Sequence, residues 1–125
     1  DGFGVKQLLE AGLVVAVISG RESAAVEHRM IELGIQHIIQ GTSDKVAAFK
    51  LLVKDLGINE AQAVYVGDDV PDLPLLRRVG FSVAVSNAHD DVKAECDHTT
   101  VKAGGFGAVR EVCDLVLQAN QDSNN

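Results

Sequence analysis

Three carboxylates follow one apolar segment of the sequence. Asp68, Asp69 and Asp72 stand within five positions in the stretch YVGDDVPDLP, at the end of the run Ala63–Gly67. Ionised groups this close together repel one another unless a cation binds between them or one of them keeps a proton. Mg²⁺ is a hard ion that prefers carboxylate and phosphate oxygens, so it is the obvious candidate for such a cation. Asp69 and Asp72 could instead cap a short following helix, and the residue types alone leave both interpretations open.

Other polar side chains stand at the ends of apolar runs or at helix starts. Ser19 ends the run LVVAVIS and precedes Gly20, so its hydroxyl and nearby N–H groups could bind a phosphate, or Ser19 could cap the next helix. Lys45 lies just inside a predicted helix start, where a cation opposes the helix dipole. This placement indicates a nearby anion, although an exposed lysine would also explain it. Arg21 and Arg29 are eight residues apart, so they could bind a carboxylate or phosphate from one helical face, or face solvent.

The order of apolar and amphipathic segments predicts the scaffold that positions these side chains. β-Branched apolar runs alternate with helical periodicity, which is typical of an α/β fold with a parallel sheet. In such sheets ligands bind at the carboxyl ends of the strands, where segments 19–21, 41–45, 67–72 and 86–89 fall. Without repeats or linkers, residues 1–125 are predicted to form one domain. We predict strands at 13–19, 35–39, 63–67, 82–85 and, weakly, 98–100, with helices at 4–11, 22–33, 44–56, 71–78 and 106–119.

The composition argues against several classes of function. With a formal net charge of −7 and no cluster of Lys and Arg, the chain offers no electrostatic surface for nucleic acid or anionic membranes. No apolar run reaches the ~18 residues that a membrane helix requires. Cys96 and Cys113 lack the spacing of a metal site or disulfide scaffold, which points to the reducing cytoplasm. The four histidines show no ligand spacing and are interpreted as structural or surface residues, and GGFGA (104–108) lacks the third glycine of a dinucleotide-binding loop.

Three short motifs occur in the order in which one enzyme superfamily carries them. VISGR, GTSDK and VGDDVPDLP resemble the second, third and fourth motifs of the haloacid dehalogenase superfamily of phosphatases. Over nearly the whole chain, the segments DGFGVKQLLEAG, VISGR, QGTSDK, YVGDDVPDLPLLRRVGFSVAVSNAH and GGFGAVREVCDLVL are similar to the 3-deoxy-D-manno-octulosonate 8-phosphate (Kdo 8-phosphate) phosphatases. The resemblance implies a three-layer Rossmann-like α/β fold, with helices on both faces of a parallel sheet and without a cap domain.

The same resemblance implies a reaction and roles for individual residues. The reaction is Mg²⁺-dependent hydrolysis of Kdo 8-phosphate to Kdo and phosphate, a step of lipopolysaccharide precursor synthesis, through an aspartyl-phosphate. Asp68 is then the metal ligand, supported by Asp69 and Asp72. Ser19 binds the phosphoryl oxygens and Lys45 balances the charge. The substrate-binding residues that the family implies are Lys6, Gly20, Arg21 and Arg29.

The chain departs from the family pattern at two places. Phe106 stands where the last family motif has arginine, which puts in doubt any contact that this arginine makes. The first superfamily motif, Asp-x-Asp-Gly, carries the nucleophile and the general acid and is absent from the sequence. In the family it ends a central strand, so we expect an N-terminally truncated domain whose first strand lies upstream of Asp1, between predicted strands 13–19 and 63–67. A hairpin after that strand helps to build a homotetramer in the family, and the chain alone is expected to be inactive.

Two alternatives remain for the function. A related domain could serve as a non-catalytic oligomerisation module, and loss of Mg²⁺ binding would favour that interpretation. The same core could also hydrolyse another nonulosonate phosphate, because the motifs do not fix the sugar. A receiver domain of two-component signalling fits less well, since it places its lysine after the phosphoacceptor strand, whereas Lys45 precedes Asp68.

Overall fold

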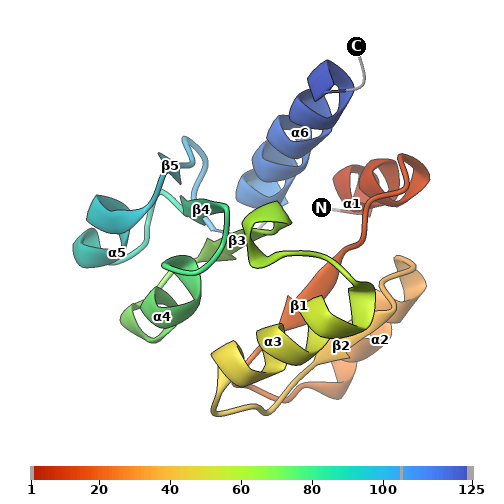
Figure 1. The fold of residues 1–125 in the computed structure, drawn as a ribbon, viewed down its shortest axis with the longest axis horizontal. Coiled ribbons are helices and arrows are strands. Elements are labelled where there is room, and N and C mark those ends of the chain that lie inside the picture. Colours follow the sequence, from red (N-terminus) through yellow and green to blue (C-terminus); the bar gives the residue numbers. More distant parts are fainter. Residues whose placement is uncertain (1, 105, 124–125) are drawn as a thin grey trace. The chain divides into compact units, whose positions relative to one another are not determined.

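The computed structural model describes residues 2–104 and 106–123 as an α/β arrangement of helices and parallel strands (Figure 1). Its residues gather into two compact units: residues 1–43 and 105–125 form the first unit, and residues 44–104 form the second. All three strand pairs are parallel, which confirms the α/β class and the parallel pairing expected from the sequence. The expectation of a single domain stays a prediction.

The first unit contains two strands and three helices. Its strands pair in parallel, with Val17 opposite Ile38 in the middle of the register. Helix α2 begins after Ser23, whose hydroxyl accepts a hydrogen bond from Val26 N–H at 3.2 Å and so satisfies one of the free donors of the first turn. The elements are α1 (Gly2–Glu10), β1 (Ala16–Ile18), α2 (Ala24–Glu32), β2 (His37–Ile39) and α6 (Phe106–Ser123).

Helix α1 packs along α6, and both helices contribute to the core of the first unit (Figure 1). They approach closely at Gly4, where an added Cβ would lie 2.9 Å from Cys113 Cβ. This contact leaves no room for a side chain and explains why a glycine is accepted inside a helix. The buried side chains of this core belong to Val5, Leu8, Ile35 and Cys113.

The second unit is built around three parallel strands. β3 pairs with β4, and β4 pairs with β5, so β4 lies in the centre of this sheet. Helix α3 has Asp44 as its N-cap, which accepts from Ala47 N–H at 3.0 Å, and Gly57 ends it with a φ of 67°. The helices are α3 (Lys45–Leu56), α4 (Leu73–Leu76), α5 (Asp90–Glu95) and the 3₁₀ turns η1 (Glu60–Gln62) and η2 (Val70–Asp72). The strands are β3 (Val64–Gly67), β4 (Phe81–Ala84) and β5 (His98–Thr99).

The core of the second unit is apolar and centred on β4. Val83 and Ala84 of this strand are fully buried, and so are Val92 of α5 and Leu75 of α4, since both helices pack against β4. Burying a side chain of the size of Val or Leu contributes roughly 1.5–3 kcal/mol. This packing fixes β4, the strand that pairs with β3 and so holds the segment from which the three aspartates extend.

The structure differs from the sequence-based expectation mainly in the lengths of the elements. Strand β1 is shorter than the predicted 13–19, because its pairing with β2 begins only at Ala16. Helix α6 continues to Ser123, beyond the predicted end at Ala119. The 3₁₀ turn η1 and the helix α5 were not predicted, although two acidic residues at the start of α5 favour a helix N-terminus there.

The strands form two sheets, one in each unit. In the described part of the chain, β1 is hydrogen-bonded to β2 and to no other strand, and β3 is bonded to β4 alone. One edge of each of these strands therefore has no strand partner among the described residues. These are the two strands between which the family resemblance places its central strand, and that expectation stays a prediction.

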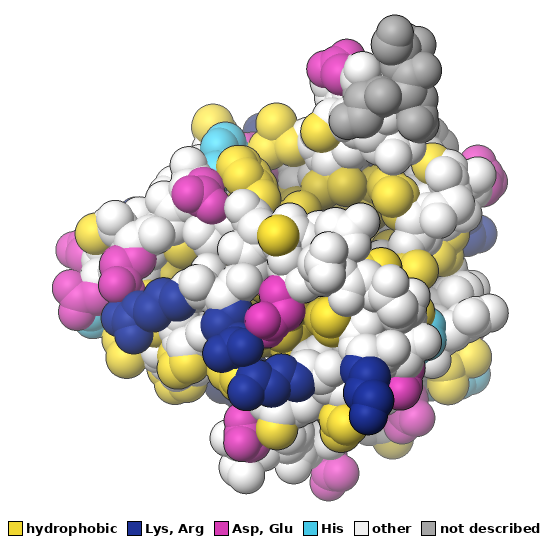
Figure 2. All heavy atoms as spheres, viewed as in Figure 1, with side chains coloured by type: hydrophobic (Ala, Val, Ile, Leu, Met, Phe, Trp, Pro, Cys, Tyr) yellow, Lys and Arg dark blue, Asp and Glu magenta, His cyan; other side chains and the backbone are white. Residues whose placement is uncertain are grey.

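Charged side chains of both signs are interspersed on the face drawn in Figure 2, and hydrophobic side chains reach the surface between them. Among the residues whose burial is described, the most exposed large hydrophobic ones are Val101 and Leu51, which are 85% and 64% exposed. Within residues 2–104 and 106–123, no helix combines the length and the apolar character needed to cross a membrane.

Gly80 precedes β4 and lies against the segment before β3. Its N–H donates to Ala63 O at 3.1 Å, and a Cβ added to Gly80 would clash with the backbone carbonyl oxygen of Ala61. Because that neighbour is backbone, Gly80→Ala must displace it, and we expect urea denaturation to show a loss of about 1–3 kcal/mol in unfolding free energy. Gly20→Ala is the control, since its Cβ would meet nothing nearer than Thr42 O at 3.5 Å. An equal loss in both variants would contradict this expectation.

Candidate functional site

The three predicted carboxylates lie together at the end of β3. Asp69 Oδ1 accepts a hydrogen bond from Val70 N–H at 2.7 Å. Asp72 Oδ2 accepts from the N–H groups of Asp68 and Asp69 at 3.0 and 3.3 Å. Both Asp69 and Asp72 therefore cap the turn η2, which confirms the capping interpretation for them. Gly67 permits this tight turn, because a Cβ there would lie 2.8 Å from Asp72 Cβ.

Asp72 makes the most hydrogen bonds in this cluster. It is only 4% exposed, and its Oδ1 accepts from Lys45 Nζ and Tyr65 Oη, each at 2.8 Å. Burial opposes ionisation of this carboxyl group, but the hydrogen bonds from Lys45, the Asp68 N–H and Tyr65 hold its pKa below the ordinary value. Each oxygen of Asp72 thus accepts two hydrogen bonds. Asp72 is therefore held as an anion, and both of its oxygens are occupied by hydrogen bonds.

Lys45 reaches this cluster from the first turn of α3. Its Nζ lies 2.8 Å from Asp72 Oδ1 and its side chain is 24% exposed, so the alternative of an exposed lysine is wrong. The position of Lys45 at a helix start indicated a nearby anion, and Asp72 is such an anion. An ammonium group has three N–H bonds, so the pair leaves donors for a second anion such as a phosphate.

Tyr65 belongs to the cluster and was missed by sequence reasoning. It lies on β3 and donates its hydroxyl to Asp72. Burial raises the pKa of Tyr65 far above its ordinary value, and the negative charge of Asp72 raises it further, so the phenol stays protonated. One signal was available: Tyr65 is the only tyrosine of the chain and stands two positions before Gly67, on the same face of the strand.

Asp68 presents an exposed carboxylate at the end of β3. Partial burial raises its pKa above the ordinary value, and the hydrogen bond and the charge of Asp72 raise it further, while Lys45 acts in the opposite direction. A cation bound at Asp68 would offset the neighbouring negative charges of Asp72 and Asp69. This is the electrostatic setting that favours binding of a cation.

The carboxylate of Asp68 suits Mg²⁺, because this ion can keep water molecules as its other ligands. The described residues contain no group of three or more His, Cys, Asp or Glu side chains that could hold a metal ion. Mg²⁺ is commonly bound through one or two carboxylates, with water and phosphate oxygens completing an octahedral shell, so Asp68 fits as one of its ligands. Asp69 and Asp72 would then support the metal indirectly, because they fix the backbone around Asp68.

Ser19, Gly20 and Arg21 form the turn after β1 in the first unit. This turn is joined to the loop after β2, because Thr42 N–H donates to Ser19 O at 3.2 Å. Ser19 Oγ accepts a hydrogen bond from Arg21 N–H at 3.1 Å. The interpretation of Ser19 as a helix cap is therefore wrong, since Ser23 caps α2. The role of Ser19 towards a phosphate stays a prediction.

The basic residues predicted to bind substrate lie on different elements of the first unit. Lys6 is exposed on α1, and Arg29 is on α2, where its Nη1 lies 3.6 Å from Glu32 Oε2. The idea that Arg21 and Arg29 share a helical face is wrong, because α2 begins at Ala24 and Arg21 precedes it. Their binding roles stay predictions, and so does their convergence with the carboxylates of the second unit.

The loop after β4 also reaches the end of β3. Val85 N–H donates to Gly67 O at 3.3 Å, and His89 N–H donates to Asp68 O at 3.2 Å. His89 Nδ1 accepts from Asp91 N–H at 3.1 Å, so this histidine caps α5. His89 thus has the structural role expected of the histidines, and its backbone helps to fix Asp68.

The glycine-rich segment 104–108 leads into α6. Gly104 N–H donates to Asn87 Oδ1 at 2.7 Å. Gly105 and the side chain of Phe106 lie outside the described residues. The consequence of having Phe106 where the family has arginine therefore stays a prediction.

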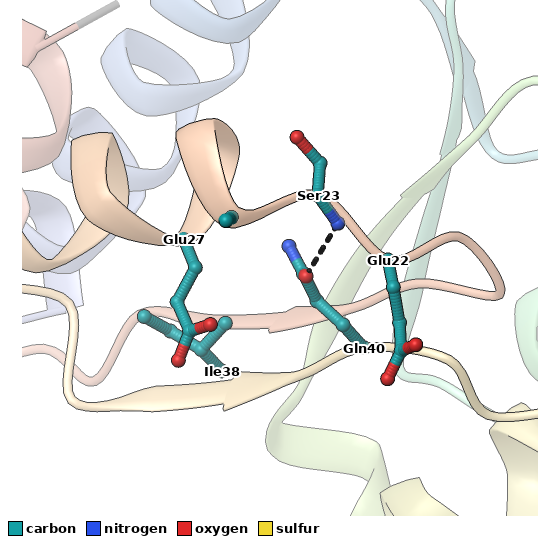
Figure 3. A pocket seen from close by; sticks show the side chains of 6 residues that line it. Glu22, Ser23, Glu27, Ile38 and Gln40 are labelled. Atoms are coloured by element: carbon teal, nitrogen blue, oxygen red, sulfur yellow. Dashed lines mark hydrogen bonds between the residues drawn. The ribbon is translucent and has the colours of Figure 1, made fainter.

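A pocket of about 420 Å³ opens in the first unit near the start of α2 and the end of β2 (Figure 3). Ser23 N–H donates to Gln40 Oε1 at 2.9 Å, and the side chains of Glu22 and Glu27 lie on either side of Gln40. Two carboxylates repel a phosphate, so this pocket does not suit a phosphoryl group. Its lining residues are Glu22, Ser23, Ala24, Glu27, Ile38 and Gln40.

Comparison with known proteins identifies the relatives of the chain. A sequence profile of haloacid dehalogenase-like hydrolases matches residues 31–112. The 3-deoxy-D-manno-octulosonate 8-phosphate phosphatase KdsC of Escherichia coli (strain K12) is 47% identical over 119 residues, which are 95% of this chain and 63% of that enzyme. The chain therefore spans slightly less than two thirds of the length of this curated relative.

Two solved structures resemble the chain in both fold and sequence. The 3-deoxy-D-manno-octulosonate 8-phosphate phosphatase from Moraxella catarrhalis, in complex with magnesium ion, phosphate ion and KDO, is 48% identical, with a TM-score of 0.91 over 94% of this chain and 68% of that chain. The cobalt-bound deoxy-D-mannose-octulosonate 8-phosphate phosphatase (YrbI) from Haemophilus influenzae is 41% identical, with a TM-score of 0.92 over 96% of this chain and 70% of that chain. The chain therefore belongs to the haloacid dehalogenase-like hydrolases, and within them to the group that includes the Kdo 8-phosphate phosphatases.

Proposed function

We propose that this protein hydrolyses Kdo 8-phosphate to Kdo and phosphate in a Mg²⁺-dependent reaction. The observation that carries the proposal is the position of Asp72, which holds Lys45 Nζ through one oxygen and the backbone of Asp68 through the other. A cation and an exposed carboxylate are thereby held at the end of one strand. The cation can pair with a phosphate oxygen, and the carboxylate can bind a metal ion. The names of the relatives above support Kdo 8-phosphate as the substrate.

Each predicted site residue has a role in this proposal. Lys45 donates to a phosphoryl oxygen, and Ser19 donates its hydroxyl to another. Asp68 holds Mg²⁺, which when bound polarises the phosphate and neutralises part of its charge. Asp69 and Asp72 keep the Asp68 backbone in place. Four residues bind the sugar acid in this proposal. Their guanidinium, ammonium and backbone N–H groups donate to its carboxylate and hydroxyl groups, and they are Lys6, Gly20, Arg21 and Arg29.

The proposal assigns the nucleophile to a segment that the printed sequence does not contain. The superfamily motif Asp-x-Asp-Gly is absent from the sequence. The edges of β1 and β3 that lack a strand partner among the described residues support a further strand, because the strands of parallel sheets are normally paired and covered. An aspartate at the end of that strand would form the aspartyl-phosphate, and the 125-residue chain alone would not turn over substrate.

The assembly and location that we propose are those implied by the family, a homotetramer in the cytoplasm. The spacing of Cys96 and Cys113 does not suit a disulfide scaffold, which supports a reducing compartment. Light scattering after size exclusion would measure the number of subunits.

A phosphate-release assay tests the proposed reaction. The protein expressed from its complete coding sequence is expected to hydrolyse Kdo 8-phosphate with Mg²⁺, and to lose activity in EDTA. Lys45→Ala should lower kcat/KM by about 100-fold, the typical loss when one group that stabilises developing charge is removed. Lys50→Ala is the matched control, since Lys50 is exposed on the same helix, and its activity should stay within about twofold of wild type.

The other outcomes of this assay separate the alternatives. Release from another nonulosonate phosphate, but not from Kdo 8-phosphate, would keep the reaction and correct the substrate. Absence of turnover together with absence of Mg²⁺ binding would favour the oligomerisation module. Turnover by the 125-residue chain alone would contradict the assignment of the nucleophile to another segment.

A further inference from the structure

We propose that Tyr65 is a positioning residue for Lys45 and Asp68, acting through Asp72. The inference rests on the proposed phosphatase function and adds a residue that none of the superfamily motifs assigns. Tyr65 Oη and Lys45 Nζ donate to the same atom, Asp72 Oδ1, and both distances are 2.8 Å. The phenol and the ammonium group are therefore neighbours on one acceptor oxygen.

The rigid member of this pair is the tyrosine. Tyr65 is fixed by its place on β3, which pairs with β4 from Val64 to Gly67. Its ring has only two side-chain torsions, whereas the lysine side chain has four and follows whatever acceptor it finds. The hydroxyl of Tyr65 therefore sets where Asp72 Oδ1 lies, and the position of that oxygen sets the direction of Lys45 Nζ.

The hydrogen bond from Tyr65 to Asp72 also affects Asp68, the proposed metal ligand. Asp72 is a planar carboxylate, so fixing Oδ1 also fixes Oδ2, which accepts the N–H groups of Asp68 and Asp69. If the hydroxyl is removed, Lys45 Nζ remains as the donor to Oδ1 among the described residues, and the carboxylate can rotate towards it. The phosphate-binding cation and the metal-binding carboxylate would then lose their fixed separation, which slows a reaction that depends on positioning.

Tyr65→Phe in the protein expressed from its complete coding sequence tests the proposal. We expect kcat to fall on the order of tenfold, as for loss of a hydrogen bond to a charged group, with KM within about twofold, at a temperature where the variant is folded. In a Lys45→Ala background the same change should lower kcat by clearly less than tenfold, because the cation is gone and only the effect through Asp68 remains. An equal tenfold loss in both backgrounds would overturn the proposal.

Ser82→Ala is the matched control for a purely structural effect. Ser82 lies opposite Tyr65 in the β3–β4 register and is buried, but its hydroxyl bonds with Asp97 instead of Asp72. The variant loses a buried hydroxyl next to the site and should keep wild-type kcat after correction for the folded fraction. If Ser82→Ala lowers kcat as much as Tyr65→Phe does, Tyr65 has only a structural role.

A readout without substrate separates this proposal from the phosphatase function. The ammonium signal of Lys45 in a ¹H–¹⁵N correlation spectrum, assigned by its loss in Lys45→Ala, reports how firmly this group is held. We expect proton exchange with water to be several-fold faster in Tyr65→Phe and unchanged in Ser82→Ala. If no sugar-acid phosphate is hydrolysed, the proposed function fails, and this spectrum still decides on Tyr65. An unchanged Lys45 signal in Tyr65→Phe would overturn the positioning role.

Discussion

Replacing Asp72 with alanine is expected to lower the free energy of unfolding by about 3 kcal/mol, as for a buried ion pair that loses one partner. The variant leaves the Lys45 ammonium group, only 24% exposed, without the carboxylate that it contacts. It also removes the acceptor of the Tyr65 hydroxyl and of the N–H groups of Asp68 and Asp69. Urea denaturation in EDTA measures the loss in the absence of metal.

The pH dependence of this loss identifies its electrostatic origin. The folded pKa of Asp72 lies below the ordinary value of 3.8, so its ionised form contributes stability above that pH, and the contribution is lost as the pH falls through the folded pKa. The difference between wild type and Asp72→Ala should therefore be full at neutral pH and shrink in strong acid. Asp69→Ala is the control, since loss of this exposed cap costs about 1 kcal/mol. An Asp72→Ala loss no larger than that of the control would contradict the central role of Asp72.

The part of the site that could be predicted from the sequence is the part fixed by local spacing. Asp68, Asp69 and Asp72 fall within five positions after an apolar strand, so a turn that brings them together needs no distant partner. Their helix-capping bonds follow from the same short spacing. The order of the three motifs also identified the family, because a motif is recognised from residue types and does not require coordinates.

Contacts between distant segments could not be predicted in the same way. Lys45 and Asp72 are 27 positions apart, and they meet because α3 packs on α4. The helix start at Lys45 indicated an anion but not which one. Tyr65 stands in an apolar strand, where an aromatic residue is most often part of the core, and only its hydroxyl contact shows its relation to Asp72.

Helix boundaries limited the prediction for the first unit. The predicted helix 22–33 begins two residues later, at Ala24, because Ser23 and not Ser19 provides the capping hydroxyl. That small shift leaves Arg21 in the preceding turn and removes the helical-face argument for it. Caps are local and short, so several nearby Ser, Thr or Asp residues can serve, and the sequence alone does not choose among them.

Replacing Asp68 with asparagine is expected to have opposite effects on stability and activity. A carboxyl group whose folded pKa is raised destabilises the fold when it is ionised, so the neutral amide should raise the melting temperature in EDTA at neutral pH. The same change removes the proposed Mg²⁺ ligand. The rise in melting temperature that wild type gains from added Mg²⁺ should therefore disappear. Phosphatase activity should fall by about three orders of magnitude, because a bound metal supplies several kcal/mol of charge stabilisation.

The opposite signs of these effects distinguish a metal ligand from a structural carboxylate. Asp72→Asn, in contrast, should lower the melting temperature in EDTA, since Asp72 is held as an anion by Lys45 and Tyr65. Asp69→Asn is the nearer control: it keeps a side-chain oxygen for the Val70 N–H and should retain the response to Mg²⁺. Differential scanning fluorimetry with EDTA and with Mg²⁺ measures all three variants. If Asp68→Asn is less stable than wild type in EDTA, or keeps the full Mg²⁺ response, Asp68 is a structural residue and the metal is bound elsewhere.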